Sequence, residues 1–137
     1  MLNNLKKMML LFSIGILVSC IENNNIPYKD VVLEIDTIYV PDHFKFGTID
    51  TIHIAYSLPD DCSEFRSVYY QYQDTARILA INALMYDRAI CVTSISNRVI
   101  KFPIEVFQME AFVFKLWKGE GVNGVGIYQE IVVPVEY

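Results

Sequence analysis

Hydrophobic and polar residues alternate along most of the chain beyond its first quarter. The clearest stretch reads TIHIAYSL, and its large apolar residues are Ile52, Ile54, Tyr56 and Leu58. Successive side chains of a β-strand point to opposite faces of the sheet, so a period of two predicts a strand with one buried face. We therefore expect a strand over residues 51–58.

Six other segments repeat this alternation, and they cover residues 31–40, 67–73, 77–86, 98–106, 111–117 and 127–135. The breaks between them carry turn-forming residues, as in PDHFKFG, LPDDCSEF, QDTA and KGEGVNGVG. About seven short strands separated by such turns favour an all-β fold over an α/β unit. We expect a single antiparallel β-sandwich over residues 31–137 rather than a closed barrel.

One of these segments also has features of a helix. Residues 75–89, TARILAINALMYDRA, are rich in Ala, Leu, Met and Arg, which are good helix formers. As a strand, however, the segment places Leu79, Ile81, Ala83 and Met85 together on one face, whereas helical spacing groups its apolar residues less cleanly. We therefore predict a strand and keep a helix as the alternative.

The first twenty residues have the layout of an export signal. Lys6 and Lys7 precede an apolar run over residues 8–18, which is too short to span a bilayer as a mature helix. The run leads into Leu17-Val18-Ser19-Cys20, which resembles the bacterial lipobox, the motif cut just before its cysteine. An ordinary signal peptide with a chance cysteine near the cut is the alternative.

The lipobox resemblance implies a membrane anchor. Residues 1–19 would be a cleaved lipoprotein signal peptide, and Cys20 would carry a diacylglyceryl group and commonly a further acyl chain such as palmitate. Two or more acyl chains hold a protein stably on a membrane. The polar, Asn-rich segment that follows predicts a flexible tether over residues 20–30, about 30 Å long at full stretch.

The residues behind the cysteine bear on localisation. Enteric-type sorting retains lipoproteins with Asp after the cysteine in the inner membrane, and Ile21 stands there instead. We therefore expect the outer membrane of the cell envelope. Some bacteria export lipoproteins to the cell surface when a cluster of acidic residues follows the cysteine. Here only Glu22 supplies an acid, so the choice between periplasmic and surface exposure stays open.

The charge balance excludes one class of partner. The whole chain has a net charge of −5, and removal of Lys6 and Lys7 with the signal peptide leaves 9 basic and 16 acidic residues, a net charge of −7. Such a protein lacks the basic face that binds phosphate backbones, so we expect no nucleic-acid partner. Without an acyl anchor it is also not attracted to anionic lipid.

Two cysteines remain after acylation of Cys20. In an oxidising envelope Cys62 and Cys91 are most simply a disulfide, which stabilises the fold by about 3 kcal/mol; two buried free thiols are the alternative. Neither cysteine belongs to a CxxC pair, and His43 and His53 are distant in sequence, so a zinc site has little support.

Several motifs together resemble small Bacteroidales lipoproteins with an immunoglobulin-like sandwich. They are a proline shortly before the first core cysteine, a second cysteine after a strand, KFP at residues 101–103, FVFKLWKG at 112–119, and a last strand YQEIVVPV. The resemblance implies a fold and a location, since most of these proteins have no assigned activity. The chain departs from the pattern at Gln108-Met109-Glu110, where those proteins usually carry Gly before the aromatic strand.

Strand alternation also predicts which loops lie together. If consecutive strands run antiparallel, the loops of Cys62 and Cys91 lie at the end where the tether leaves. The opposite, distal end then gathers aromatic side chains and a histidine, namely His43, Phe44, Phe46 and Phe107. Function often resides on loops held by a rigid scaffold, so these residues are a candidate binding patch. The plainer interpretation is that Phe44 or Phe46 caps the core under the first hairpin.

The only tryptophan of the chain belongs to the second part of the candidate patch. Alternation directs Phe112, Phe114 and Leu116 inward, which leaves Trp117 pointing outward, with Tyr128 on a neighbouring strand. Exposed aromatic rings often stack on sugars. Cover for an edge strand is the plainer role for Trp117.

Three classes of function follow from these features. We favour a non-catalytic interaction module of the cell envelope, either an accessory subunit or an adhesion component that contacts another envelope protein. A carbohydrate-binding lipoprotein of a glycan-uptake system is the second class and predicts an exposed aromatic strip around Trp117, Tyr128 or Tyr69. A carrier of a small apolar ligand is the third. We expect no enzyme, no cofactor and no metal, because no serine lies in a recognised catalytic motif and Asp60-Asp61 beside Pro59 is typical of a turn.

Overall fold

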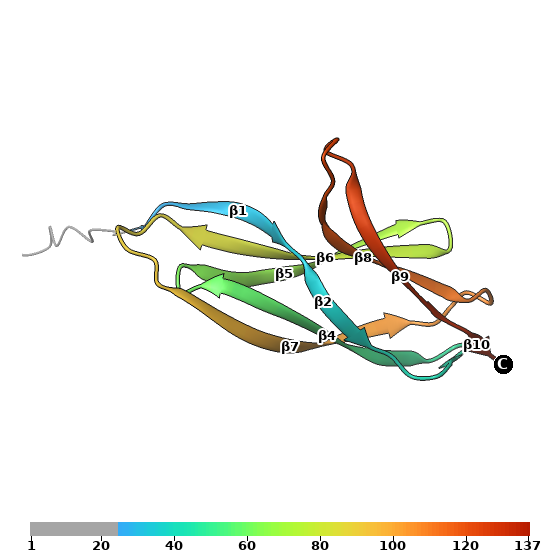
Figure 1. Ribbon diagram of the computed structural model, residues 1–137. Helices are drawn as coiled ribbons and strands as arrows, with labels where there is room; N and C mark the ends of the chain where they lie inside the picture. Colours follow the sequence, from blue (N-terminus) through green and yellow to red (C-terminus); the bar gives the residue numbers. More distant parts are fainter. Residues whose placement is uncertain (1–24) are drawn as a thin grey trace, which may run out of the picture.

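The computed structural model describes residues 25–137, which form β-strands and contain no helix. The predicted signal peptide and Cys20 lie outside the described residues. In chain order the strands are β1 (Tyr28–Leu33), β2 (Ile35–Tyr39), β3 (Phe44–Lys45), β4 (Ile49–Asp60), β5 (Ser63–Gln73), β6 (Ala76–Tyr86), β7 (Thr93–Glu105), β8 (Phe112–Glu120), β9 (Gly126–Val133) and β10 (Val135–Glu136) (Figure 1).

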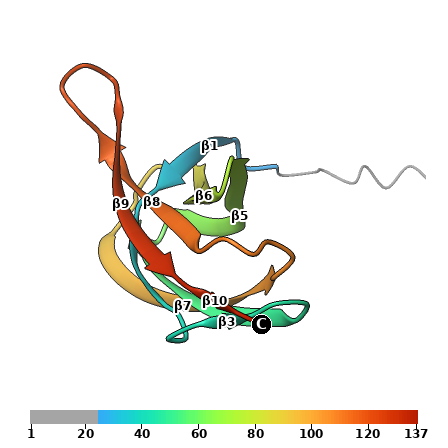
Figure 2. The same ribbon diagram turned by 90° about the vertical axis from the view of Figure 1, so that its right-hand side faces the viewer.

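The strands form two facing sheets, so the prediction of an all-β sandwich is confirmed (Figure 2). In the five-stranded sheet β5 pairs along one edge of β6, while β1 and β8 share the opposite edge and β9 pairs with β8. The second sheet has the order β2-β4-β7, and the short strands β3 and β10 pair at one end. Most pairings are antiparallel; β8 runs parallel to β6, and β10 to β3.

The predicted strand faces carry the core. All four large apolar residues of the 51–58 segment are buried on β4, as are Phe112, Phe114 and Leu116 on β8. On β6 the buried inward residues include Leu79, Ile81 and Ala83. The strand prediction for residues 75–89 is thus confirmed over the helical alternative for the segment from Ala76 to Tyr86.

The first predicted strand, residues 31–40, divides between the two sheets. β1 pairs with β6, Glu34 forms the crossover, and β2 pairs with β4 in the opposite sheet. β1 also begins three residues earlier than expected, at Tyr28, because residues 28–30 pair with the end of β6 and the Tyr28 ring packs edge-on against Tyr86 at 5.9 Å. The predicted tether of residues 20–30 is therefore too long at its carboxyl end.

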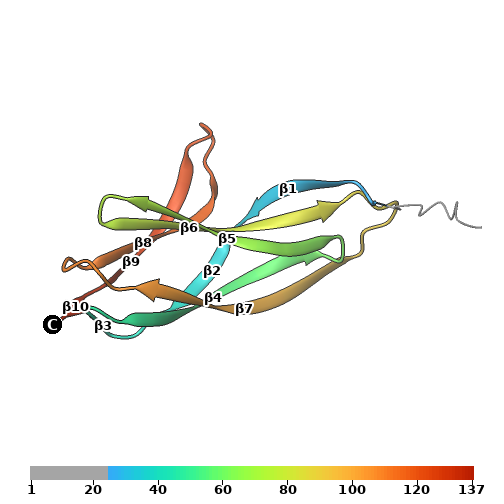
Figure 3. The same ribbon diagram turned by 180° about the vertical axis from the view of Figure 1, so that it is seen from behind.

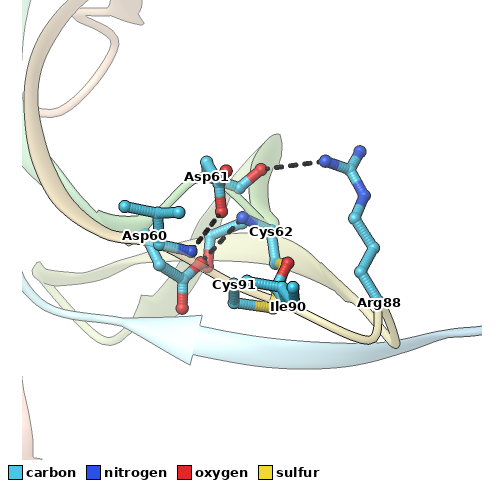
Figure 4. Close-up of a disulfide and its surroundings, with 8 residues drawn as sticks. Asp60, Asp61, Cys62, Arg88, Ile90 and Cys91 are labelled. Carbon is cyan, nitrogen blue, oxygen red and sulfur yellow. Dashed lines mark hydrogen bonds between the residues drawn. A yellow bond between two sulfur atoms is a disulfide. The ribbon is translucent and has the colours of Figure 1, made fainter.

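The predicted disulfide is present between Cys62 and Cys91, whose Cα atoms lie 5.5 Å apart (Figure 4). It joins the β4–β5 turn to the loop after β6, at the end of the sandwich where the described chain begins (Figures 1 and 3). The loops that carry His43, Phe46 and Phe107 lie at the opposite end with the carboxyl terminus, as strand alternation predicts. The geometric prediction for the two ends is confirmed.

The β8–β9 hairpin leaves the plane of its sheet. It projects sideways from the long axis of the sandwich, and its tip stands clear of the other strands (Figures 1 and 2). The pairing shifts register between Trp117 and Glu120, and Gly119 adopts a φ of +101° at this bulge. A side chain is strained in that conformation, so glycine allows the bend that tilts the hairpin outward.

Candidate functional site

An open depression lies where β1 leaves the five-stranded sheet and the β8–β9 hairpin bends away from it. Its volume is about 650 Å³, within the range of small-molecule sites. The lining side chains that define this aromatic notch are Tyr69, Ile78, Ala80, Trp117, Glu120 and Tyr128, and Val31 and Val32 of β1 close one side. The notch therefore collects residues from five strands on the outer face of the sheet.

Strand register explains why three aromatic rings meet there. Tyr69 pairs with Ala80 across β5 and β6, and Trp117 pairs with Tyr128 across β8 and β9. β6 and β8 are paired up to Leu79 and Leu116, so Ala80 and Trp117 come next in the same row. The row across the four strands thus reads tyrosine, alanine, tryptophan, tyrosine, with the smallest side chain in the floor.

The rings of the notch have different degrees of contact with solvent. Tyr69 is 40% exposed and Tyr128 is 42% exposed, while Trp117 is partly buried. The hydroxyl end of the Tyr128 ring lies over Gly126, where an added Cβ would stand 2.8 Å from the phenol oxygen. Glycine at position 126 therefore lets this ring lie against the backbone.

The hairpin wall of the notch is tied to the sheet crossover. Lys118, which points away from the notch, donates a hydrogen bond to the carbonyl oxygen of Ile35 and another, at 2.8 Å, to that of Asp36. Both acceptors lie at the start of β2. The base of the wall is thus fixed by a charge-assisted contact next to the residue that carries the indole.

The notch has an acidic rim and a polar border. Glu120 is the charged side chain of its lining. In the next row towards the distal end, Lys115 donates to Gln73 at 3.2 Å and lies 3.8 Å from the carboxylate of Glu130. The nearby cation is therefore already paired, and the notch offers aromatic faces with one carboxylate.

The candidate patch predicted from sequence divides into two separate places. Trp117 and Tyr128 lie together in the notch, whereas His43, Phe44 and Phe46 lie at the distal end. Phe44 is 0% exposed and so is no part of any exposed patch. Its place under the first hairpin agrees with the capping interpretation.

Two of the remaining distal residues, His43 and Phe46, contact the carboxyl-terminal residues Glu136 and Tyr137. The His43 Nε2 atom lies 3.2 Å from a carboxylate oxygen of Glu136, and the Phe46 ring packs against Tyr137 with centroids 6.2 Å apart. Phe107 is 66% exposed. These contacts close the distal end of the sandwich rather than form a concave site.

The acidic pair beside the disulfide forms turn contacts (Figure 4). The Asp60 carboxylate accepts hydrogen bonds from the Cys62 backbone N–H at 3.1 Å and from the Ser63 hydroxyl at 2.7 Å. The Asp61 carboxylate accepts one from the Val92 N–H at 2.8 Å. Among residues 25–137 no group of three or more His, Cys, Asp or Glu side chains could hold a metal ion.

Comparisons with protein-family models, with curated proteins and with solved structures give no match for this chain. The resemblance to small Bacteroidales lipoproteins therefore stays a prediction. Within the described part of the chain, no helix is long and apolar enough to cross a membrane.

Proposed function

We propose that this protein is a non-catalytic binding module, held at a bacterial cell envelope by lipid on Cys20, and that its ligand contacts the aromatic notch. The immunoglobulin-like classification and the outer-membrane location belong to the same proposal. An acyl anchor followed by a short tether keeps the sandwich near the membrane while its flank stays accessible.

The observation that carries the binding function is the row formed by Tyr69, Ala80, Trp117 and Tyr128. Large rings usually cover the core or an edge, but this row is placed on the outer face of a sheet around a hollow with an alanine floor. Partly exposed apolar surface of this kind favours a ligand. Phe44 and Phe46 at the distal end, by contrast, pack against Phe112 and Tyr137.

A carrier with a cavity between the sheets has less support. The space between the sheets is filled by buried side chains from both, including Ile52 and Ile54 of β4 and Phe112 and Phe114 of β8. Interiors packed in this way leave no room for a ligand unless the sheets separate. An open site on the flank agrees better with capture of a ligand from the surroundings.

Photo-crosslinking in intact cells tests the binding function. A benzophenone amino acid replaces Val32, which is 50% exposed at the rim of the notch, or Tyr39, which is 61% exposed on the opposite sheet. Position 32 should give an adduct on irradiation and position 39 should not. Equal adducts at both positions, or none at position 32, would contradict the proposal.

The anchor needs a test of its own. Cells fed an alkyne-labelled fatty acid should label the wild-type protein, while Cys20→Ala should accumulate as an unlabelled, uncleaved precursor. Normal processing and membrane retention of Cys20→Ala would exclude the lipobox interpretation. Protease treatment of intact and lysed cells then tells whether the sandwich faces the surface or the periplasm.

A further inference from the structure

We infer that the aromatic notch binds a sugar ring of a neutral polysaccharide, an inference that rests on the proposed binding function and assigns its ligand class. The occupant must fit a hollow of about 650 Å³ that is open on one side. It must also match aromatic faces and a carboxylate. A pyranose within a longer glycan chain meets both conditions, because the chain extends out through the open side.

The chemistry of the lining agrees with a ring that has one apolar face. Aromatic faces carry partial negative charge and attract the weakly positive C–H groups on the face of a pyranose. The indole of Trp117 and the phenol of Tyr128 come from paired positions on β8 and β9, and both rings line the same hollow. The Tyr69 hydroxyl donates a hydrogen bond to Gln71, which orients the third ring on the other side of Ala80.

Electrostatics determines which sugars fit. The Glu120 carboxylate accepts hydrogen bonds from sugar hydroxyls but repels uronate or sulfate groups, and among residues 25–137 no cationic side chain lines the notch. Lys115 in the adjoining row is held by Gln73 and Glu130. With a net charge of −5 over the whole chain, the protein should discriminate against acidic glycans.

Lys118 is a positioning residue for this site. It does not line the notch, yet its bonds to the carbonyls of Ile35 and Asp36 fix the base of the hairpin that carries Trp117. Lys118→Ala should release the wall and weaken sugar binding several-fold. Lys118→Arg keeps a cationic donor and should restore most of the affinity. If Lys118 had no part in positioning the hairpin, Lys118→Ala and Lys118→Arg would both bind sugar as the wild type does.

The single tryptophan makes the test direct, because its emission comes from the notch. The purified full chain is titrated with soluble starch, mannan, xylan and hydroxyethyl cellulose, and with alginate and polygalacturonate as acidic counterparts. At least one neutral polysaccharide should shift Trp117 emission and protect it from acrylamide quenching. The acidic ones should do neither.

Two variants locate the binding. Ala80→Leu fills the floor and should lower affinity by about tenfold or more while Trp117 still reports on the folded protein. Trp117→Ala should lower the affinity similarly, as measured by calorimetry. Phe107→Ala at the exposed distal end is the matched control, and its affinity should stay within about twofold of wild type.

The outcomes separate this inference from the proposed function. No response to any neutral polysaccharide, or sugar binding unchanged in Ala80→Leu, would overturn the sugar assignment. If position 32 still crosslinks to an envelope protein in that case, the binding function stands and only the ligand class is wrong. If crosslinking at position 32 also fails, both are wrong.

Discussion

Two aromatic regions of this molecule differ in how their rings are used. At the distal end Phe44 is enclosed, with ring centroids 5.2 Å from Phe112 and 6.1 Å from Phe114 in edge-to-face arrangements. On the flank, Trp117 and Tyr128 face outward over a hollow. Both regions look alike in composition, so aromatic content alone does not distinguish a core cap from a binding site.

Adjacent residues of β5 show the same contrast. Tyr69 pairs with Ala80 on the outer face and lines the notch. Tyr70 points inward, where its ring lies 5.2 Å from that of Phe102 in the opposite sheet. The face of the strand and the size of the cross-strand neighbour decide the role of each ring.

The largest effect should come from the enclosed region. Phe44→Ala removes a wholly buried ring and leaves a cavity next to Phe112 and Phe114, which should lower the free energy of unfolding by about 3–5 kcal/mol. Urea denaturation followed by circular dichroism measures the loss. A change below about 1 kcal/mol would mean that Phe44 is not part of the core.

The disulfide lies at the end of the sandwich away from Phe44. Its removal tests whether ligand binding at the notch depends on the overall stability of the fold. It closes a loop with a sequence separation of 29, and its removal should cost about 3–4 kcal/mol. Reduction, or the variant with both Cys62→Ala and Cys91→Ala, should lower the melting temperature while any ligand response at the notch persists below that temperature. Free thiols in the native protein would contradict the bridge.

Arg77 should have an intermediate effect, because it is a buried cation whose partners within residues 25–137 are neutral oxygens and aromatic rings. Its guanidinium lies 4.0 Å from the Tyr72 ring centroid and 5.2 Å from that of Phe112. It donates to the Ala76 carbonyl at 3.0 Å and to the Gln108 side chain. Arg77→Ala leaves these acceptors unpaired and should cost about 1–3 kcal/mol of stability.

Arg77→Lys is the matched control for that prediction. A lysine keeps the charge but loses the planar fork that both stacks on rings and reaches several acceptors, so it should recover only part of the loss. Full recovery by lysine would show that the charge alone matters.

The smallest effect concerns pH and the inward tyrosine. Burial raises the pKa of Tyr70 to about 12 from its ordinary value of 10.0, and the nearby Arg77 opposes the rise. The fold therefore favours the neutral phenol, so this contribution to stability is complete below pH 10 and is lost as the pH rises towards 12. Tyr70→Phe should unfold with a weaker dependence on alkaline pH than wild type or Tyr39→Phe; an unchanged dependence would refute the assignment.

Local pattern predicted most of the fold. Period-two alternation identified the buried faces of β4, β6 and β8, and strand alternation brought Cys62 and Cys91 to one end. The division of the first strand was missed because alternation continues through Glu34 while the hydrogen-bonding partner changes. The spacing of three between the buried residues Ile35 and Ile38 was a signal of the bulge in β2.

The notch was predicted only in part. Sequence placed Trp117 and Tyr128 on the outer face, and the sugar hypothesis included Tyr69, but Ala80 and Glu120 were missed. Tyr69 and Ala80, on β5 and β6, come beside Trp117 and Tyr128, on β8 and β9, because β6 pairs with β8. No local sequence pattern encodes the register of such a parallel pair. A small residue on the outer face of an otherwise apolar strand is the signal that could have pointed to the floor.

The turn before β8 is held by a side chain. The side-chain amide of Gln108 donates to the carbonyls of Glu110 at 3.2 Å and Ala111 at 3.3 Å. Its oxygen accepts from Arg77. Side-chain hydrogen bonds thus stabilise this turn.

The most direct test of the contrast between the two regions is the free energy of unfolding of Trp117→Ala, measured by circular dichroism beside that of Phe44→Ala. If Trp117 serves to bind a ligand, Trp117→Ala should lower the free energy of unfolding by less than about 1 kcal/mol, well below the decrease in Phe44→Ala. A loss of about 3 kcal/mol or more would mean that Trp117 is structural cover for the hairpin, and the notch would no longer stand as a binding site.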